Sequence, residues 1–217
     1  MIDFSAARRH MIDCQLRPSR VTSAPLLDAM AALPREQFVP AAVRGIAYVD
    51  EDLPIGGGRF LIEPLVLARL IQAAAPAPGD TVLDVAAATG YSSAVLSRLA
   101  GSVVALEDDK ALADQAAAAL SKLAIDNVQV VVGPLGEGHL KRAPYAVILV
   151  NGAVEHVPDA LIAQLAEGGR LAAVVGTGPV GRATLLTKRR GQASPRILFD
   201  AGVSPLKGFT KEPGFVF

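Results

Sequence analysis

The sequence predicts an α/β fold: one domain with a mostly parallel sheet, antiparallel C-terminal strands and helices on both faces. Short, nearly continuous apolar segments alternate with helical segments between Thr81 and Val175, as in strand–helix–strand units. The chain has 217 residues, a length typical of one domain. No low-complexity linker or internal repeat divides it. We therefore expect a single domain over 1–217, with an N-terminal helical annex and loop (1–75) before the core (76–217).

Capping residues and prolines define the elements of the annex. Ser5 is a predicted N-cap, Thr22 or Ser23 is another, and Pro18 and Pro34 end the helices that follow. Three consecutive glycines at 56–58 predict a mobile or tightly turned loop in place of a regular element. The predicted elements are helices over 5–16, 23–33 and 64–75, with helical turns over 35–38 and 40–48.

The core begins after Pro76 and repeats a strand, a turn and a helix. Gly168 and Gly169 are expected to end its last helix. A polar turn around Gly191 separates two apolar runs, a spacing typical of antiparallel pairing. The predicted strands are 81–85, 103–106, 128–132, 146–150, 170–175, 183–188 and 196–200, and the predicted helices are 91–100, 109–123 and 158–166.

Charge and cysteine content exclude several classes of partner. Twenty-one basic and twenty-one acidic residues cancel, which argues against nucleic acid or an anionic membrane as a partner. No apolar run reaches the length of a membrane span. Cys14 is the single cysteine, so no intrachain disulfide forms, and a cytoplasmic location is expected. His139 and His156 lack metal-ligand spacing, so no metal site is predicted, and the oligomeric state is left open.

The turn after the first core strand is the first candidate for ligand binding. Ligands of open α/β sheets bind beyond the carboxyl ends of the strands, near the point where strand order reverses. The strand leads through Asp84 into a glycine-poor turn that ends at Gly90, and a helix starts near Tyr91. Backbone N–H groups at that helix start suit an anionic group or a cofactor carboxylate.

Glu107 closes the second core strand, 23 residues after Asp84. A carboxylate there can accept hydrogen bonds from both hydroxyls of a ribose, which would hold a nucleoside. In the alternative interpretation, Glu107, Asp108 and Asp109 only favour the N-terminus of the next helix.

The glycine spacing bears on which nucleotide binds. A dinucleotide site with the G-x-G-x-x-G pattern would need its third glycine at Tyr91, so a nicotinamide oxidoreductase is disfavoured. Gly90 instead fits the last glycine of an acidic-x-G-x-G-x-G pattern, the spacing of S-adenosylmethionine binders. Ala86 and Ala88 hold the first two glycine positions.

Longer segments resemble the protein-L-isoaspartate O-methyltransferase family over nearly the whole chain. The annex contributes the stretches 30–40 and 47–56, and the core contributes 82–84 with 90–99, 144–150 and 165–171. The resemblance implies a Rossmann-like methyltransferase fold and S-adenosylmethionine as cofactor. It also implies methyl transfer to the carboxylate of an isoaspartyl residue in a protein or peptide, a repair reaction. The cofactor-binding positions that we infer are Asp84, Ala86, Ala88, Gly90, Tyr91, Glu107, Asp108, Pro134, Leu135 and Asn151.

Three departures from the family fall on functional positions. Ile62 and Glu63 occupy the acceptor loop at the catalytic positions, and Ile62 replaces a serine, so the hydroxyl is missing. Ala86 and Ala88 add methyl groups beside the cofactor, with a cost of about 1 kcal/mol wherever φ must be positive. Pro134 stands in place of an aspartate and cannot accept the adenine amino hydrogen, whereas Leu135 can still pack on the adenine face.

Two functions therefore remain open from the sequence. The first is a methyltransferase with an altered acceptor loop. The second is a catalytically degenerate binding module that holds a protein or a small molecule in the same crevice. For Asn151 and Gly152, which follow the fourth core strand, a pocket-lining role and an ordinary polar loop are both open.

Overall fold

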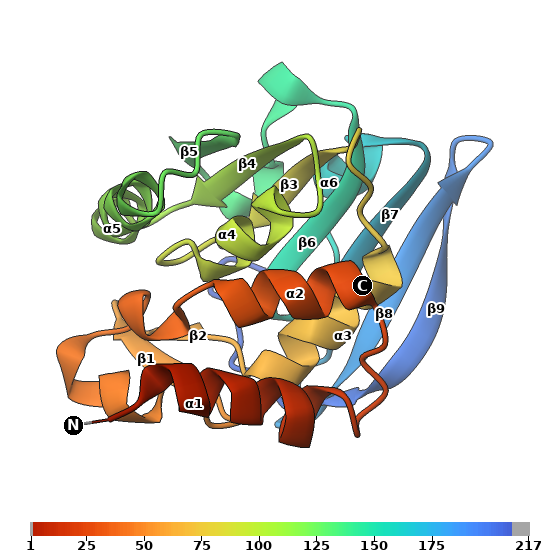
Figure 1. Ribbon diagram of the computed structural model, residues 1–217. Coiled ribbons are helices and arrows are strands. Elements are labelled where there is room, and N and C mark those ends of the chain that lie inside the picture. Colours follow the sequence, from red (N-terminus) through yellow and green to blue (C-terminus); the bar gives the residue numbers. More distant parts are fainter. Residues whose placement is uncertain (1, 210–217) are drawn as a thin grey trace.

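The computed structural model describes residues 2–209, so the predicted core range of 76–217 extends past its end. Within the described residues the core is a seven-stranded sheet in the order β5-β4-β3-β6-β7-β8-β9 (Figure 1). Strands β3 to β7 pair in parallel, and β8 and β9 continue the sheet in antiparallel pairing, as predicted. The strands are β3 (Thr81–Val85), β4 (Ser102–Glu107), β5 (Val128–Val132), β6 (Tyr145–Val154), β7 (Leu165–Val175), β8 (Gly181–Arg189) and β9 (Gln192–Ala201).

Helices cover both faces of the sheet. Successive side chains along each strand point to opposite faces, so apolar residues on both faces pack against helices. In β6, Val147 and Leu149 belong to one hydrophobic cluster, and Ile148 and Val150 belong to another. The first cluster also contains apolar residues of α3 (Pro64–Ala74), α4 (Tyr91–Ser97) and α5 (Lys110–Lys122). The second contains Leu161 of α6 (Asp159–Ala163) and Leu135 of the short 3-10 helix η4 (Leu135–Glu137). A further 3-10 turn, η5 (Leu140–Arg142), precedes β6.

The annex packs on the α3 side of the sheet and shares its hydrophobic cluster (Figure 1). Its first helix begins after Asp3 in place of the predicted Ser5, because the Asp3 side chain accepts the Ala6 N–H at 2.9 Å. The annex elements are α1 (Phe4–His10), the π-helical η1 (Met11–Leu16), α2 (Ala24–Ala32), and the 3-10 turns η2 (Arg35–Gln37) and η3 (Ala41–Ile46). Among the described residues, no helix is long and apolar enough to cross a membrane.

The three-glycine segment forms a tight hairpin turn, in agreement with the tightly turned alternative of the prediction, although Gly56 itself belongs to a strand. Strands β1 (Leu53–Gly56) and β2 (Arg59–Leu61) pair in antiparallel fashion across Gly57 and Gly58. Both turn residues have positive φ, 61° and 72°, the conformation that two-residue hairpin turns require and that glycine adopts without a steric penalty. Glycine here therefore fixes a hairpin.

The helix before β7 is shorter than predicted, and Gly168 and Gly169 do not end it. Helix α6 ends at Ala163, and both glycines lie inside β7, where the register with β6 shifts. Gly168 has a φ of 77°, and a Cβ on Gly169 would lie 2.8 Å from the carbonyl oxygen of Ala166. The glycines therefore permit a bulge in a strand.

Candidate active site

The site lies where the order of the parallel strands reverses. Strand β3 has β4 on one side and β6 on the other, so the carboxyl ends of these three strands border a common crevice. Val85 pairs with Leu106 of β4 and with Val150 of β6. This register brings the turn after β3, Glu107 and Asn151 together, as the sequence analysis predicted for three of its site positions.

The turn after β3 forces two alanines into the left-handed region. Ala86 has a φ of 60° and Ala88 a φ of 55°, where a Cβ costs about 1–2 kcal/mol. Gly90 follows with a φ of 92°, and a Cβ there would lie 3.1 Å from the Cβ of Ala116. The sequence analysis expected a cost of about 1 kcal/mol wherever φ is positive, and φ is positive at both alanines, which are also buried.

Asp84 is fully buried and its carboxylate is engaged by protein donors. Ser92 donates to it at 2.7 Å and Asn151 at 2.6 Å, and Ser93 donates as well. Burial raises the pKa of Asp84 to about 6, and the three hydrogen bonds oppose that rise. Asp84 therefore links β3 to the start of α4 and to β6. Its predicted part in cofactor binding is then to orient the turn after β3.

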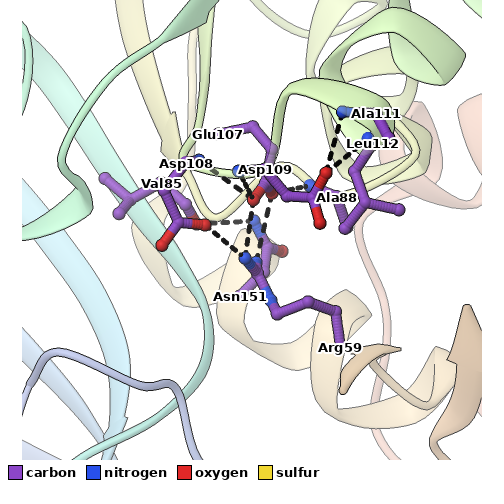
Figure 2. Close-up of polar contacts among 9 residues, drawn as sticks. All are labelled: Arg59, Val85, Ala88, Glu107, Asp108, Asp109, Ala111, Leu112 and Asn151. Atoms are coloured by element: carbon purple, nitrogen blue, oxygen red, sulfur yellow. Dashed lines mark hydrogen bonds and ion pairs between the residues drawn. The ribbon is translucent and has the colours of Figure 1, made fainter. Parts of the chain in front are cut away.

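The Glu107 carboxylate is fully buried, and Figure 2 shows it surrounded by Arg59 and by the backbone of Ala88, Asp108 and Asp109. The backbone N–H of Ala88 donates to Oε2 at 2.7 Å, and the N–H groups of Asp108 and Asp109 donate to Oε1 at 3.0 and 3.1 Å. Burial raises the pKa of Glu107, whereas Arg59 and the backbone N–H groups lower it. The helix-start interpretation holds for Asp109, which caps α5 through the N–H groups of Ala111 and Leu112, but not for Glu107.

Arg59 is a site residue that the sequence analysis missed. From β2 its Nη1 lies 2.6 Å from Oε1 of Glu107 and its Nη2 lies 3.1 Å from Oε2. Nη1 also pairs with Asp108 at 2.9 Å, and the Arg59 side chain is only 10% exposed. A cation directly after three glycines was the available signal, but nothing in the sequence indicates a partner 48 residues away.

A cavity of about 270 Å³ opens beside Glu107, on the side of the predicted nucleoside. Gly57, Arg59, Asp108, Leu135 and Lys207 line it, together with Asp109. Leu135 is buried there, whereas Pro134 before it is exposed at the start of η4. The structure thus brings Leu135 and Asp108 to the predicted pocket and leaves Pro134 outside its lining.

Tyr91 has a different environment from the one that the sequence suggests. Its buried ring packs against Phe38, with centroids 5.4 Å apart, and beneath the guanidinium of Arg35 at 4.8 Å. Both partners belong to the annex, and the neighbouring Thr89 hydroxyl donates to the Phe38 carbonyl at 2.6 Å. The Tyr91 side chain therefore joins the core to the annex. The predicted contact of Tyr91 with the cofactor would be made by its backbone N–H.

The acceptor-loop positions lie on the other side of Arg59. Ile62 is buried, its carbonyl accepts from Nη2 of Arg35 at 2.7 Å, and its side chain lines a narrow crevice of about 10 Å³ with Arg59 and Asn151. Glu63 is the N-cap residue of α3, and its backbone N–H donates to Asp52 at 3.0 Å. Burial, with Asp50 and Asp52 nearby, raises the pKa of Glu63 to about 7.

This fold and this site define a Rossmann-like methyltransferase. The family model described as protein-L-isoaspartate(D-aspartate) O-methyltransferase matches residues 6–201. A protein-L-isoaspartate O-methyltransferase from Koribacter versatilis is 40% identical over 205 residues, which cover 94% of this chain and 92% of that relative.

Two solved structures share the fold. A protein-L-isoaspartate O-methyltransferase aligns with a TM-score of 0.80 at 25% identity, over 93% of this chain and 66% of that chain. A chain from Plasmodium falciparum, assigned to the same methyltransferase and solved with S-adenosyl-L-homocysteine, gives a TM-score of 0.79 at 18% identity, over 95% and 99%.

The chain belongs to the protein-L-isoaspartate O-methyltransferase family, whose members are S-adenosylmethionine-dependent enzymes. The predicted family, fold, enzyme class and cofactor are confirmed. Nothing in these comparisons favours the alternative of a degenerate binding module.

Proposed function

We propose that this chain methylates the side-chain carboxylate of isoaspartyl residues in proteins, and that Glu107 holds the ribose of its cofactor. The single observation that carries the site assignment is the position of Glu107. Its buried carboxylate closes β4 at the switch point, beside a cavity lined by Leu135 and Asp108. The acceptor is supported by the family and by the names of relatives such as the Koribacter protein.

The residues present suit a nucleoside cofactor. Leu135 gives the cavity an apolar wall for a base. Glu107 adjoins Asp108 of its lining and accepts an N–H of the turn that carries Ala86 and Ala88. The amide of Asn151 donates a hydrogen bond to Asp84, which stabilises the turn after β3. Asp84, Gly90 and the backbone N–H of Tyr91 would hold the turn in shape for the cofactor.

The chemistry asks little acid–base help from the protein. When bound, S-adenosylmethionine supplies an electrophilic methyl group, so that a carboxylate oxygen forms a bond to its carbon while the carbon–sulfur bond breaks and the sulfonium leaves as a neutral thioether. A carboxylate is already a nucleophile, and the protein contributes chiefly by aligning the two partners and excluding water. Ile62 and the hairpin form the walls on the acceptor side.

Calorimetry with S-adenosylhomocysteine tests the assignment of Glu107. We expect Glu107→Gln to weaken binding by more than about tenfold, because the amide loses the charge and one of two acceptors for the ribose hydroxyls. Glu137→Gln, an exposed site on η4, is the matched control and should bind as the wild type does. Equal affinity in the two variants would contradict the ribose assignment.

Methyl transfer to an isoaspartyl peptide, beside its aspartyl counterpart, tests the acceptor. We expect methylation of the isoaspartyl peptide only. If wild-type protein binds S-adenosylhomocysteine but both peptides give equal background counts, the proposed acceptor is wrong although the methyltransferase class stands.

A further inference from the structure

The Glu107 carboxylate has no acceptor capacity left within the described residues. Three backbone N–H groups and two N–H groups of Arg59 donate to it (Figure 2). An ionised carboxylate offers about four lone-pair sites, so these donors already saturate both oxygens. A ribose can therefore engage Glu107 only if one of them leaves.

The guanidinium of Arg59 is the donor that can leave. The N–H groups of Ala88, Asp108 and Asp109 belong to turns that are fixed by β3, β4 and the cap of α5. Arg59 reaches Glu107 through a long side chain, which Figure 2 shows, from a two-stranded hairpin with a glycine turn. Displacing it breaks no backbone hydrogen bond.

Arg59 lies between the two halves of the site. It lines the cavity of Asp108 and Leu135, and it also lines the crevice of Ile62 and Asn151. A rotation of its side chain away from Glu107 therefore leads into the acceptor side. Such a movement keeps the cation inside the site.

The acceptor side lacks another cation among the described residues that line it. Two of its polar side chains are already engaged. Asp52 accepts the N–H groups of Glu63 and Ser204, at 3.0 and 2.7 Å. The amide nitrogen of Asn151 donates to Asp84 and to the carbonyl of Val85. Ile62 offers only an apolar wall, so a carboxylate entering this crevice would meet its cation in Arg59, with the hydroxyl of Ser204 as a neutral donor in the same lining.

We propose that Arg59 determines acceptor specificity: it covers Glu107 in the free protein, is displaced by the cofactor ribose, and then binds the acceptor carboxylate. The inference rests on the proposed function. A guanidinium matches a carboxylate with two parallel N–H donors, which a single hydroxyl cannot do. Cofactor binding thus prepares the acceptor site, and the order of binding is cofactor first.

Arg59→Gln separates this role from a structural one. Loss of the competing guanidinium should tighten S-adenosylhomocysteine binding by about fivefold to tenfold, the equivalent of one partly buried ion pair. The same variant should raise the KM for an isoaspartyl peptide by about tenfold or more while kcat changes little, because a bidentate carboxylate partner is lost. Arg59→Lys keeps the charge and should restore part of the KM.

Calorimetry and steady-state kinetics are run on the wild type, both Arg59 variants and the exposed control Arg196→Gln on β9. The control should match the wild type in both measurements. An Arg59→Gln variant that binds S-adenosylhomocysteine as the wild type does, or more weakly, overturns the inference, and so does an unchanged KM. A wild type that fails to bind S-adenosylhomocysteine would instead refute the proposed function.

Because Arg59→Gln leaves a buried carboxylate without its cation, the variant is also followed by thermal unfolding. We expect a lower melting temperature without ligand and a larger upward shift on adding S-adenosylhomocysteine than in the wild type. An ion pair that is only structural lowers the melting temperature without enlarging the ligand-induced shift, and that result also overturns the inference.

Discussion

Replacing Glu63 by glutamine should stabilise the protein at neutral and alkaline pH, and less so in mild acid. Burial and the carboxylates of Asp50 and Asp52 raise the pKa of Glu63 from its ordinary value of 4.5 to about 7. The folded protein therefore holds a proton that the unfolded chain has released between these two pH values. Since the folded state binds more protons in this window, the free energy of unfolding falls as pH rises through it.

The magnitude follows from the size of the pKa change. The difference between about 7 and 4.5, at about 1.4 kcal/mol per pH unit, gives an upper limit of about 3.5 kcal/mol. Glu63 is only half-buried, and solvent screening reduces this to about 1–2 kcal/mol. Glu63→Gln removes the titration, so it should exceed the wild type by that amount above about pH 7, by a smaller amount near about pH 5, and match it below about pH 4.

Urea denaturation of both proteins between about pH 5 and about pH 8 measures the difference directly. Glu137→Gln serves as the control, because Glu137 is exposed on η4, and its difference from the wild type should stay constant with pH. A gap between Glu63→Gln and the wild type that does not grow with pH would refute the reasoning.

Two further predictions concern the residues that depart from the family. Ala88→Gly should tighten S-adenosylhomocysteine binding in calorimetry, because it removes a buried methyl from the turn, and it should relieve about 1 kcal/mol of strain at a φ of 55°. Ala124→Gly is its matched control, because Ala124 has a φ of 52° in an exposed turn after α5. Its stability should rise without a change in affinity for S-adenosylhomocysteine. Equal affinity gains in both variants would refute the steric explanation. Ile62→Ser should lower the free energy of unfolding by about 2–4 kcal/mol through lost apolar burial, yet raise isoaspartyl methylation about fivefold through one new hydrogen bond. An unchanged methylation rate would mean that the missing hydroxyl does not limit the reaction.

The sequence by itself determined the fold class and predicted the location of the candidate site. Near-continuous apolar strands alternating with helices predict a parallel sheet, because a strand buried on both faces has apolar residues at nearly every position. The antiparallel pair around Gly191 was equally readable from spacing and turn chemistry. Asp84, Gly90 and Glu107 were found because strand ends and helix starts place them at one edge of the sheet.

Only the tertiary structure decided which partners these residues take. Arg59 and Glu107 are separated by 48 residues, and an ion pair between them depends on how the hairpin returns to the sheet. Tyr91 packs on the annex and Asp84 binds Asn151, 67 residues away, for the same reason. Glycine alone does not reveal whether it ends a helix, turns a hairpin or permits a bulge, since each use requires only a positive φ or a missing Cβ. Local patterns therefore located the crevice, and long-range packing determined that a cation lies across it.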